Sequence, residues 1–421
     1  MAKYIVEQSG PLKGEVVISG AKNAVLPLMA AALLAEDECI IRDVPMLRDV
    51  TFMKEILMSL GSEVVELEDN VLSITTKDII STEAKFELVN KMRASILVMG
   101  PLLARKGVAR IPHPGGCAIG ARPIDLHLKG LEALGAVITY KDDYIEAATG
   151  SQGLIGDTIY LDFPSVGATE NIMMAAVLAE GTTYLENAAE EPEIVDLANF
   201  LNKMGAKIKG AGTDTIRIEG VDKLGGAKHT VIPDRIETGT FMLAAAITKG
   251  AVHIQNAVPD HVKPIIAKLR ECGVRIEVGD DDLIVRADLG PQSSTDIKTL
   301  PYPGFPTDIQ SPFMAYLTTV EGSSTVIETV FENRFMHVAQ LNKMGASIET
   351  AGNKALIRGN ARLRGCQVMA TDLRAGAALV LAGLVAEGTT EISEVFHIER
   401  GYEKFIEKFC GLGAKISRID D

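Results

Sequence analysis

The stretch TFMLAAAIT, residues 240–248, predicts a helix that is apolar or small on every side. A helix without a polar face must be surrounded by protein. Five more stretches share this character: VLPLMAAALLA (25–35), ASILVMGPLLA (94–104), NIMMAAVLA (171–179), SPFMAYLTT (311–319) and GAALVLAGLVA (376–386). We therefore expect six interior helices with the other elements around them, which inverts the usual α/β arrangement.

A second kind of helix and a hairpin complete each repeat. Apolar residues three and four apart, such as Ile194, Leu197 and Leu201, predict an amphipathic helix that a glycine ends. This glycine recurs at Gly61, Gly135, Gly205, Gly273, Gly345 and Gly413, and two short alternating stretches follow it. The period of 68 to 74 residues predicts six β-α-β-α-β-β repeats.

The repeats divide as three and three. A chain of 421 residues exceeds the size of a single core, roughly 250 to 300 residues. The polar stretch 225–234 predicts one crossing between domains, and we expect residues 4–18 to form the missing opening strand of the sixth repeat, which adds a second crossing. The expected fold is α/β, with two inside-out barrel domains, residues 1–20 plus 233–421 and residues 21–232, joined by a double-crossing hinge.

Composition excludes several classes of function. The net charge of −14 argues against nucleic-acid binding, and no window holds the ~18 apolar residues of a membrane span. The five cysteines are scattered and the N-terminal segment MAKYIVEQSGPLKG lacks a signal core, which together favour a cytoplasmic protein. The seven histidines form no HExxH motif, so we expect neither metal nor cofactor.

The predicted interior helices begin with polar groups. These are Lys22 and Asn23, Arg93, residues 165–171, residues 234–239, Asp308, and Asp372 with Arg374. Helix N-termini attract anions. Ser, Thr, Asp and Asn are also favoured there as ordinary caps, so both interpretations stay open at this point.

Seven segments resemble the UDP-N-acetylglucosamine 1-carboxyvinyltransferase family, in family order and from end to end. They are SGAKNAVLP (19–27), PGGCAIGARPIDLH (114–127), FPSVGATEN (163–171), YPGFPTDIQ (302–310), ENRFMH (332–337), TDLRAG (371–376) and IERGYE (398–403). The resemblance implies two inside-out α/β domains of three repeats each. It also implies transfer of the enolpyruvyl group of phosphoenolpyruvate to the 3-hydroxyl of UDP-N-acetylglucosamine, in peptidoglycan precursor synthesis.

The resemblance assigns catalytic roles to particular residues. Cys117 matches the family's general acid, in a Gly-rich loop that we expect to be mobile, and is the residue that fosfomycin alkylates in the family. Asp308 matches the carboxylate that accepts the sugar hydroxyl proton. Lys22, Arg122 and Arg400, with Asn23, match residues that hold phosphoenolpyruvate.

The UDP-sugar contacts also follow from the resemblance. They are Asn23, Arg93, Arg122, Pro123, Ile124, Asp125, Leu126, Ser165, Val166, Gly167, Asp308 and Val330, with Arg334, Asp372 and Arg374 in support. Some family members carry Lys where this chain has Phe163, which puts one diphosphate contact in doubt.

Three alternatives compete with this interpretation. The sister enolpyruvyl transferase of the shikimate pathway shares fold and donor but lacks the Cys117 loop. A catalytically idle sensor of UDP-N-acetylglucosamine would not need Cys117, Asp308, Lys22 and Arg400. A purely structural repeat protein would show shorter repeats and open ends.

Overall fold

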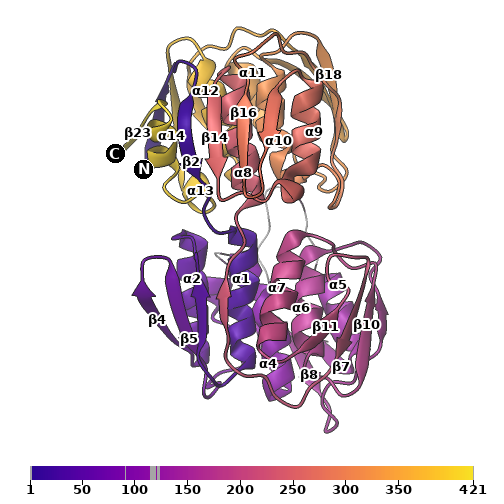
Figure 1. Ribbon diagram of the computed structural model, residues 1–421. Coiled ribbons are helices and arrows are strands. Elements are labelled where there is room, and N and C mark those ends of the chain that lie inside the picture. The colour runs from indigo at the N-terminus through magenta and orange to yellow at the C-terminus, as the bar shows by residue number, and fades with distance from the viewer. Residues whose placement is uncertain (1, 91, 114–119, 121–123, 421) are drawn as a thin grey trace. The chain divides into compact units, whose positions relative to one another are not determined.

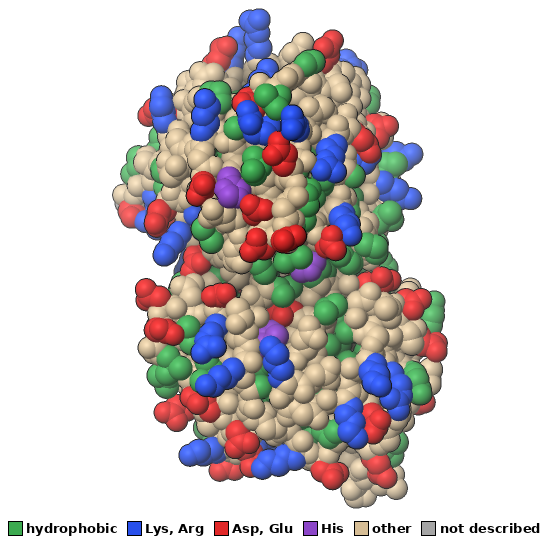
Figure 2. Space-filling view, in the orientation of Figure 1, with side chains coloured by type: hydrophobic (Ala, Val, Ile, Leu, Met, Phe, Trp, Pro, Cys, Tyr) green, Lys and Arg blue, Asp and Glu red, His purple; other side chains and the backbone are tan. Residues whose placement is uncertain are grey.

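The computed structural model describes residues 2–90, 92–113, 120 and 124–420, which form two compact units. Unit 1 is built chiefly from residues 2–19 and 233–420, and unit 2 from residues 20–113, without 91, and 124–232. No helix of the described residues is long and apolar enough to cross a membrane. Acidic and basic side chains are interspersed on the visible face of each unit (Figure 2).

Three largely buried helices form the centre of unit 1. They are α8 (Arg235–Ile247), α10 (Thr307–Leu317) and α12 (Leu373–Val385), and they pack against one another. Every residue from Ile236 to Ile247 of α8 is buried. The strands lie outside these helices (Figure 1), so the predicted inside-out α/β fold is confirmed.

Three four-stranded sheets surround this core. The first contains β2 (Lys13–Val17), β14 (Ala251–Gln255), β16 (Asp282–Arg286) and β15 (Arg275–Val278). The second contains β17 (Ile297–Lys298), β18 (Ser323–Ile327), β20 (Lys354–Arg358) and β19 (Ser347–Ala351). The third contains β21 (Gln367–Met369), β22 (Thr389–Ser393), β1 (Lys3–Glu7) and β23 (Lys415–Ile419). The remaining helices are η3 (Pro259–Val262), α9 (Lys263–Glu271), α11 (Met336–Lys343), α13 (Phe396–Glu399) and α14 (Phe405–Gly411).

The prediction of one opening strand over residues 4–18 is wrong. The segment forms two strands because Gly10 and Pro11 interrupt it. β1 pairs antiparallel with β22 and β23, so it closes the sixth repeat instead of opening it. β2 pairs parallel with β14 and opens the fourth repeat. The N-terminal segment therefore ties together two sheets of unit 1.

Unit 2 repeats the arrangement with more irregular inner helices. The inner elements are α1 (Lys22–Ala31), η1 (Ala32–Leu34), η2 (Arg93–Val98), α4 (Met99–Lys106) and α6 (Val166–Ala176). Its first sheet contains β13 (Lys228–Thr230), β3 (Cys39–Arg42), β5 (Val71–Thr75) and β4 (Glu63–Glu68). The second contains β6 (Val108–Pro112), β8 (Tyr144–Thr149) and β7 (Ala136–Tyr140). The third contains β9 (Thr158–Tyr160), β10 (Thr182–Glu186), β12 (Thr215–Glu219) and β11 (Lys207–Lys209). The other helices are α2 (Arg48–Leu60), α3 (Phe86–Val89), α5 (Asp125–Ala133) and α7 (Pro192–Lys203).

The single helix expected at 94–104 is divided into the 3-10 helix η2 and the α-helix α4. Pro101 has no N–H to donate, and the Gly100 N–H donates to Oδ1 of Asn171 on α6 over 2.7 Å. A side chain at Gly100 would come within 2.4 Å of the Asn171 carbonyl oxygen. The close approach of α6 therefore sets where the helix changes type.

Candidate active site

The starts of the interior helices fall into two groups. Ser165, Asp234 and Asp372 are N-caps whose side chains accept backbone N–H bonds, so the capping interpretation is right for them. Lys22 and Asp308 lie inside the first turn, after caps that use no side chain. These two side chains are therefore available for other contacts.

Asp308 lies between two guanidinium groups in unit 1. Arg334 donates from Nη2 to Oδ1 over 2.7 Å, and Arg374 donates from Nη2 to Oδ2 over 2.9 Å. The Asp308 side chain keeps 26% of its surface exposed, whereas the arginine side chains keep only 4% and 5%. We call Asp308, Arg334 and Arg374 the Asp308 cluster; it unites three predicted site residues from distant segments.

The two arginines decide the charge of Asp308. Burial alone would raise its pKa, but Arg374, Arg334 and the nearby Arg235 hold the pKa of Asp308 well below its usual value. Burial likewise opposes the charge of Arg374, but Asp308 raises the pKa of this guanidinium. At neutral pH the cluster thus contains one carboxylate and two cations.

A second layer of contacts fixes Arg374. Its guanidinium lies over the ring of Tyr402, 5.5 Å from the centroid, and the Tyr402 hydroxyl is 2.9 Å from Oγ1 of Thr240 on α8. The backbone N–H of Arg374 is bound by its helix cap, Asp372, over 2.9 Å. Asp372 therefore supports the cluster by orienting the start of α12.

Arg400 lies at the end of α13 and is partly buried. It acts electrostatically on His397, as Asp372 does: burial and Arg400 lower the pKa of His397, while Asp372 opposes them. Helix α13 packs against α12, the helix that carries Arg374, so Arg400 lies in the same part of unit 1 as the Asp308 cluster. Val330 lies on the chain segment between β18 and Arg334.

The first predicted site residues of unit 2 lie at the start of α1. Lys22 is its first residue, and Nζ lies 2.7 Å from Oδ2 of Asp49 on α2. The exposed fractions of the two side chains are 14% and 3%, so the ion pair is largely shielded from water. Asn23 follows and is partly buried, and Arg93 is the first residue of η2, which packs against α1.

An asparagine and a histidine join the other predicted UDP-sugar segments of unit 2. Asn171 of α6 donates from Nδ2 to the Ile96 carbonyl over 3.0 Å and lies 3.1 Å from Nδ1 of His127 on α5. A side chain at Gly167 would meet the His127 ring at 3.1 Å. This packing brings residues 124–126 at the start of α5 close to residues 165–167 at the start of α6. Phe163 is 41% exposed beside them.

Three predicted residues, Cys117, Arg122 and Pro123, lie outside the described residues. Sequence reasoning missed Asp49, His127 and Asn171 as supporting residues. His127 and Asn171 are the last residues of the segments PGGCAIGARPIDLH and FPSVGATEN, so their place in these motifs could have indicated them. Asp49 had no such signal, because its pairing with Lys22 depends on how α2 packs against α1.

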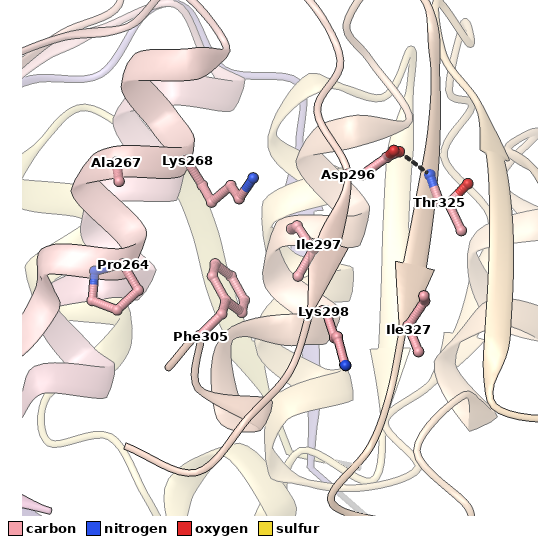
Figure 3. Close-up of a pocket in the computed structure, with 9 residues that line it drawn as sticks. All are labelled: Pro264, Ala267, Lys268, Asp296, Ile297, Lys298, Phe305, Thr325 and Ile327. Atoms are coloured by element: carbon pink, nitrogen blue, oxygen red, sulfur yellow. Dashed lines mark hydrogen bonds between the residues drawn. The ribbon is translucent and has the colours of Figure 1, made fainter. Parts of the chain in front are cut away.

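A cavity lies elsewhere in unit 1. It has a volume of about 530 Å³ and lies between α9 and the strands β17 and β18 (Figure 3). It is lined by Pro264, Ala267, Lys268, Asp296, Ile297, Lys298, Phe305, Thr325 and Ile327, none of which we predict to bind substrate. Among the described residues no group of His, Cys, Asp and Glu side chains could hold a metal ion.

Comparisons with known proteins identify the relatives of this chain. Residues 6–409 match the family model of EPSP synthase (3-phosphoshikimate 1-carboxyvinyltransferase). The UDP-N-acetylglucosamine 1-carboxyvinyltransferase 1 of Caldanaerobacter subterraneus is 62% identical, with 99% of each chain covered. The UDP-N-acetylglucosamine 1-carboxyvinyltransferase 2 of Carboxydothermus hydrogenoformans is 61% identical, with 100% of each chain covered.

Solved structures agree on the fold. The enolpyruvyl transferase NikO of Streptomyces tendae superimposes with a TM-score of 0.89 at 24% identity, covering 99% of this chain and 98% of its own. EPSP synthase of Acinetobacter baumannii gives a TM-score of 0.77 at 18% identity, with both chains covered completely. Sequence identity above 60% over the full length separates this chain from the shikimate branch, and it belongs to the UDP-N-acetylglucosamine 1-carboxyvinyltransferases within the wider EPSP synthase family.

Proposed function

We propose that this chain transfers the enolpyruvyl group of phosphoenolpyruvate to the 3-hydroxyl of UDP-N-acetylglucosamine and releases phosphate. The observation that carries the proposal is full-length identity of 62% with a 1-carboxyvinyltransferase of that name. The Asp308 cluster supports it, because three residues from separate predicted motifs meet there. The substrates are small molecules, and we propose that the enzyme works in the cytoplasm.

The proposed reaction is an addition followed by an elimination. The sugar oxygen attacks C2 of phosphoenolpyruvate, Asp308 takes the hydroxyl proton, and the Cys117 thiol protonates C3. The tetrahedral intermediate then loses phosphate from C2 and a proton from C3, which restores the double bond. Lys22, Arg122 and Arg400 hold the phosphate and carboxylate, for which planar guanidinium groups are well suited.

The resting state of Asp308 adds a condition to this mechanism. A carboxylate held by two guanidinium groups is a weak base, because both favour its charged form. A substrate oxygen that drew Arg334 or Arg374 away would raise the pKa of Asp308 toward its usual value. We infer that substrate binding activates Asp308 in this way.

We also propose that the two units are domains that close on the substrate. Predicted UDP-sugar contacts occur in both, such as Ser165 in unit 2 and Val330 in unit 1. The chain passes between the units at residues 19–20 and 232–233, so closure would turn on these two segments. Small-angle scattering with saturating UDP-N-acetylglucosamine should show a smaller radius of gyration, and an unchanged radius would contradict closure.

The decisive test is phosphate release from phosphoenolpyruvate with UDP-N-acetylglucosamine, with shikimate 3-phosphate as the control acceptor. We expect release with the first acceptor alone. Release only with shikimate 3-phosphate would assign the chain to the sister activity. Tight binding of UDP-N-acetylglucosamine without turnover would identify a sensor.

The role of Cys117 has a separate test. Fosfomycin, an epoxide phosphonate, should alkylate Cys117 alone, and faster with UDP-N-acetylglucosamine present. Burial raises the pKa of Cys39, and burial raises the pKa of Cys272 to about 11, so both thiols resist ionisation. Peptide mass spectrometry after one equivalent of drug would locate the adduct. Labelling of another cysteine, or sensitivity of Cys117→Asp, would overturn the assignment.

A further inference from the structure

One residue of unit 1 breaks a pattern that the repeats otherwise share. In four of the repeats, the strand after the interior helix begins just past a glycine, at Gly181, Gly250, Gly322 or Gly388. The residue that directly follows this strand, six positions past the glycine, is Asn187, Asn256, Glu328 or Glu394. Asn187, Asn256 and Glu394 have left-handed backbone, with φ of 53°, 54° and 57°. Glu328 is not among the residues of positive φ, so its backbone conformation departs from that of the other three.

The side chains differ as well. Asn187 and Asn256 each donate from Nδ2 to a carbonyl that follows the neighbouring parallel strand, at Leu161 and Ile18, over 2.6 and 2.8 Å. This contact joins two strands and serves the sheet. Glu328 cannot donate such a bond, because a carboxylate only accepts. It is also 98% buried, with a relative exposure of 2%, where a carboxylate needs donors.

Four donors converge on this carboxylate. Oε1 accepts from Oγ1 of Thr299 over 2.8 Å and from the backbone N–H groups of Val330 over 2.8 Å and Phe331 over 3.2 Å. Oε2 accepts from Oγ1 of Thr307 over 2.9 Å. Glu328 thus joins the end of β17, the first residue of α10 and the segment that leads to Arg334.

These contacts act on both members of one ion pair. Thr307 immediately precedes Asp308, so its hydroxyl fixes the turn that presents the carboxylate. The ring of Phe331 lies under the Arg334 guanidinium, 5.3 Å from its centroid, and Arg334 binds Asp308. A shift of the 330–331 backbone would therefore also move Arg334.

We propose that Glu328 is a positioning residue for the UDP-sugar subsite of unit 1: its buried carboxylate holds Val330 and the Arg334–Asp308 pair in register. The inference rests on the proposed function, since Val330 and Asp308 are the predicted sugar contacts. Glu328 takes no part in the proton transfers. Its loss should therefore weaken the use of the UDP-sugar more than the use of phosphoenolpyruvate.

Two substitutions separate geometry from charge. Glu328→Gln keeps an acceptor for the two N–H groups, and its amide can donate to Thr307, whereas Glu328→Ala leaves the buried donors without a partner. We expect the Michaelis constant for UDP-N-acetylglucosamine to rise about tenfold or less in Glu328→Gln and roughly a hundredfold in Glu328→Ala. The constant for phosphoenolpyruvate should stay within about threefold of wild type in both.

Two further variants serve as controls: one changes the equivalent position of the next repeat, and the other removes a single hydrogen bond to Glu328. Glu394→Gln makes the same chemical change at the same repeat position and should leave both constants within about twofold of wild type. Thr307→Val removes one donor without changing shape and should raise the UDP-sugar constant severalfold. If Glu328→Ala does not fold, the variants Glu328→Gln and Thr307→Val still test the proposal.

Hydrogen exchange gives a readout independent of turnover. Amides 329–334 should exchange faster in Glu328→Ala than in wild type, with the rest of unit 1 unchanged. The proposal is overturned by unchanged exchange there, or by a loss of turnover with both Michaelis constants at wild-type values. A wild-type enzyme that releases no phosphate defeats the proposed function instead, and faster exchange in the variant would still show that Glu328 orders the segment.

Discussion

Two carboxylates of unit 1, the partly buried Asp308 and the buried Glu237, lie in the first turns of neighbouring interior helices, and their pKa values are shifted in opposite directions. Asp308 on α10 faces two guanidinium groups, which hold its pKa well below the usual value. Glu237 on α8 faces one ammonium group, with Lys408 Nζ 2.6 Å from Oε1. Burial raises the pKa of Glu237 to about 7, and Lys408 offsets this only in part.

The difference lies in the number of partners and in access to water. Both side chains lose hydration, but Glu237 is 3% exposed and Asp308 is 26% exposed. Asp234 also lies close enough to Glu237 to raise its pKa. One cation therefore leaves a buried carboxyl near its titration point at neutral pH, whereas two arginines keep it charged.

The two carboxylates also serve different parts of unit 1. Oε2 of Glu237 accepts the backbone N–H of Ser19 over 2.8 Å, and Oγ of Ser19 donates to Glu403 over 2.7 Å. Ser19 is the last residue of unit 1 before the chain enters unit 2. Glu237 therefore anchors that passage, whereas the role proposed for Asp308 is chemical.

The largest expected effect comes from Asp308→Asn. The amide keeps the shape but cannot accept the hydroxyl proton, so turnover should fall by roughly a hundredfold to ten-thousandfold. Binding of UDP-N-acetylglucosamine should stay within about tenfold, as measured by calorimetry. The matched control is Glu237→Gln, which should retain turnover within about threefold. Equal losses in both variants would erase the distinction between the two carboxylates.

The next effect concerns the pH dependence of stability. The pKa of Glu237 is about 7 in the folded chain and about 4.5 when unfolded, so the folded state binds the proton more tightly. Its contribution to the free energy of unfolding is therefore complete below pH ~4.5 and falls by about 1.4 kcal/mol per unit up to pH ~7. Glu237→Gln should remove this decline.

Urea unfolding of both proteins at pH 5 and pH 7.5 would measure the change. The comparison with the variant is needed because burial lowers the pKa of His337 to about 4, which makes stability rise with pH between about 4 and 6.5. An identical pH dependence in wild type and Glu237→Gln would show that Glu237 is ionised throughout.

The smallest effect should come from Arg235→Gln. Arg235 lowers the pKa of Asp308 less than Arg374 and Arg334 do, and it is itself partly exposed. Asp308 should stay ionised at neutral pH, and the free energy of unfolding should change by less than about 1 kcal/mol. Arg235→Lys serves as the control that keeps the charge. A loss of turnover as large as that of Asp308→Asn would make Arg235 a third essential partner.

Much of the architecture followed from the sequence alone. The stretches around Met242, Met314 and Leu379 are apolar on all sides, and such helices have only one stable place, inside the protein. The motifs also gave Asp308, Arg334 and Arg374, which lie together although 66 residues separate Asp308 from Arg374. Local pattern sufficed here because helix burial and motif identity are properties of short segments.

Tertiary structure alone decided which strands pair and how the surroundings shift the pKa values of buried carboxyl groups. Gly10 and Pro11 mark the break between β1 and β2 in the sequence, but nothing in the alternation of the two strands says which sheet each of them joins. The network of Glu328 and the titration of Glu237 were likewise hidden, since hydrogen bonds and pKa values depend on groups brought from distant segments. A sequence shows which residues can ionise or donate; the fold alone sets how many opposite charges and how much water surround each of them.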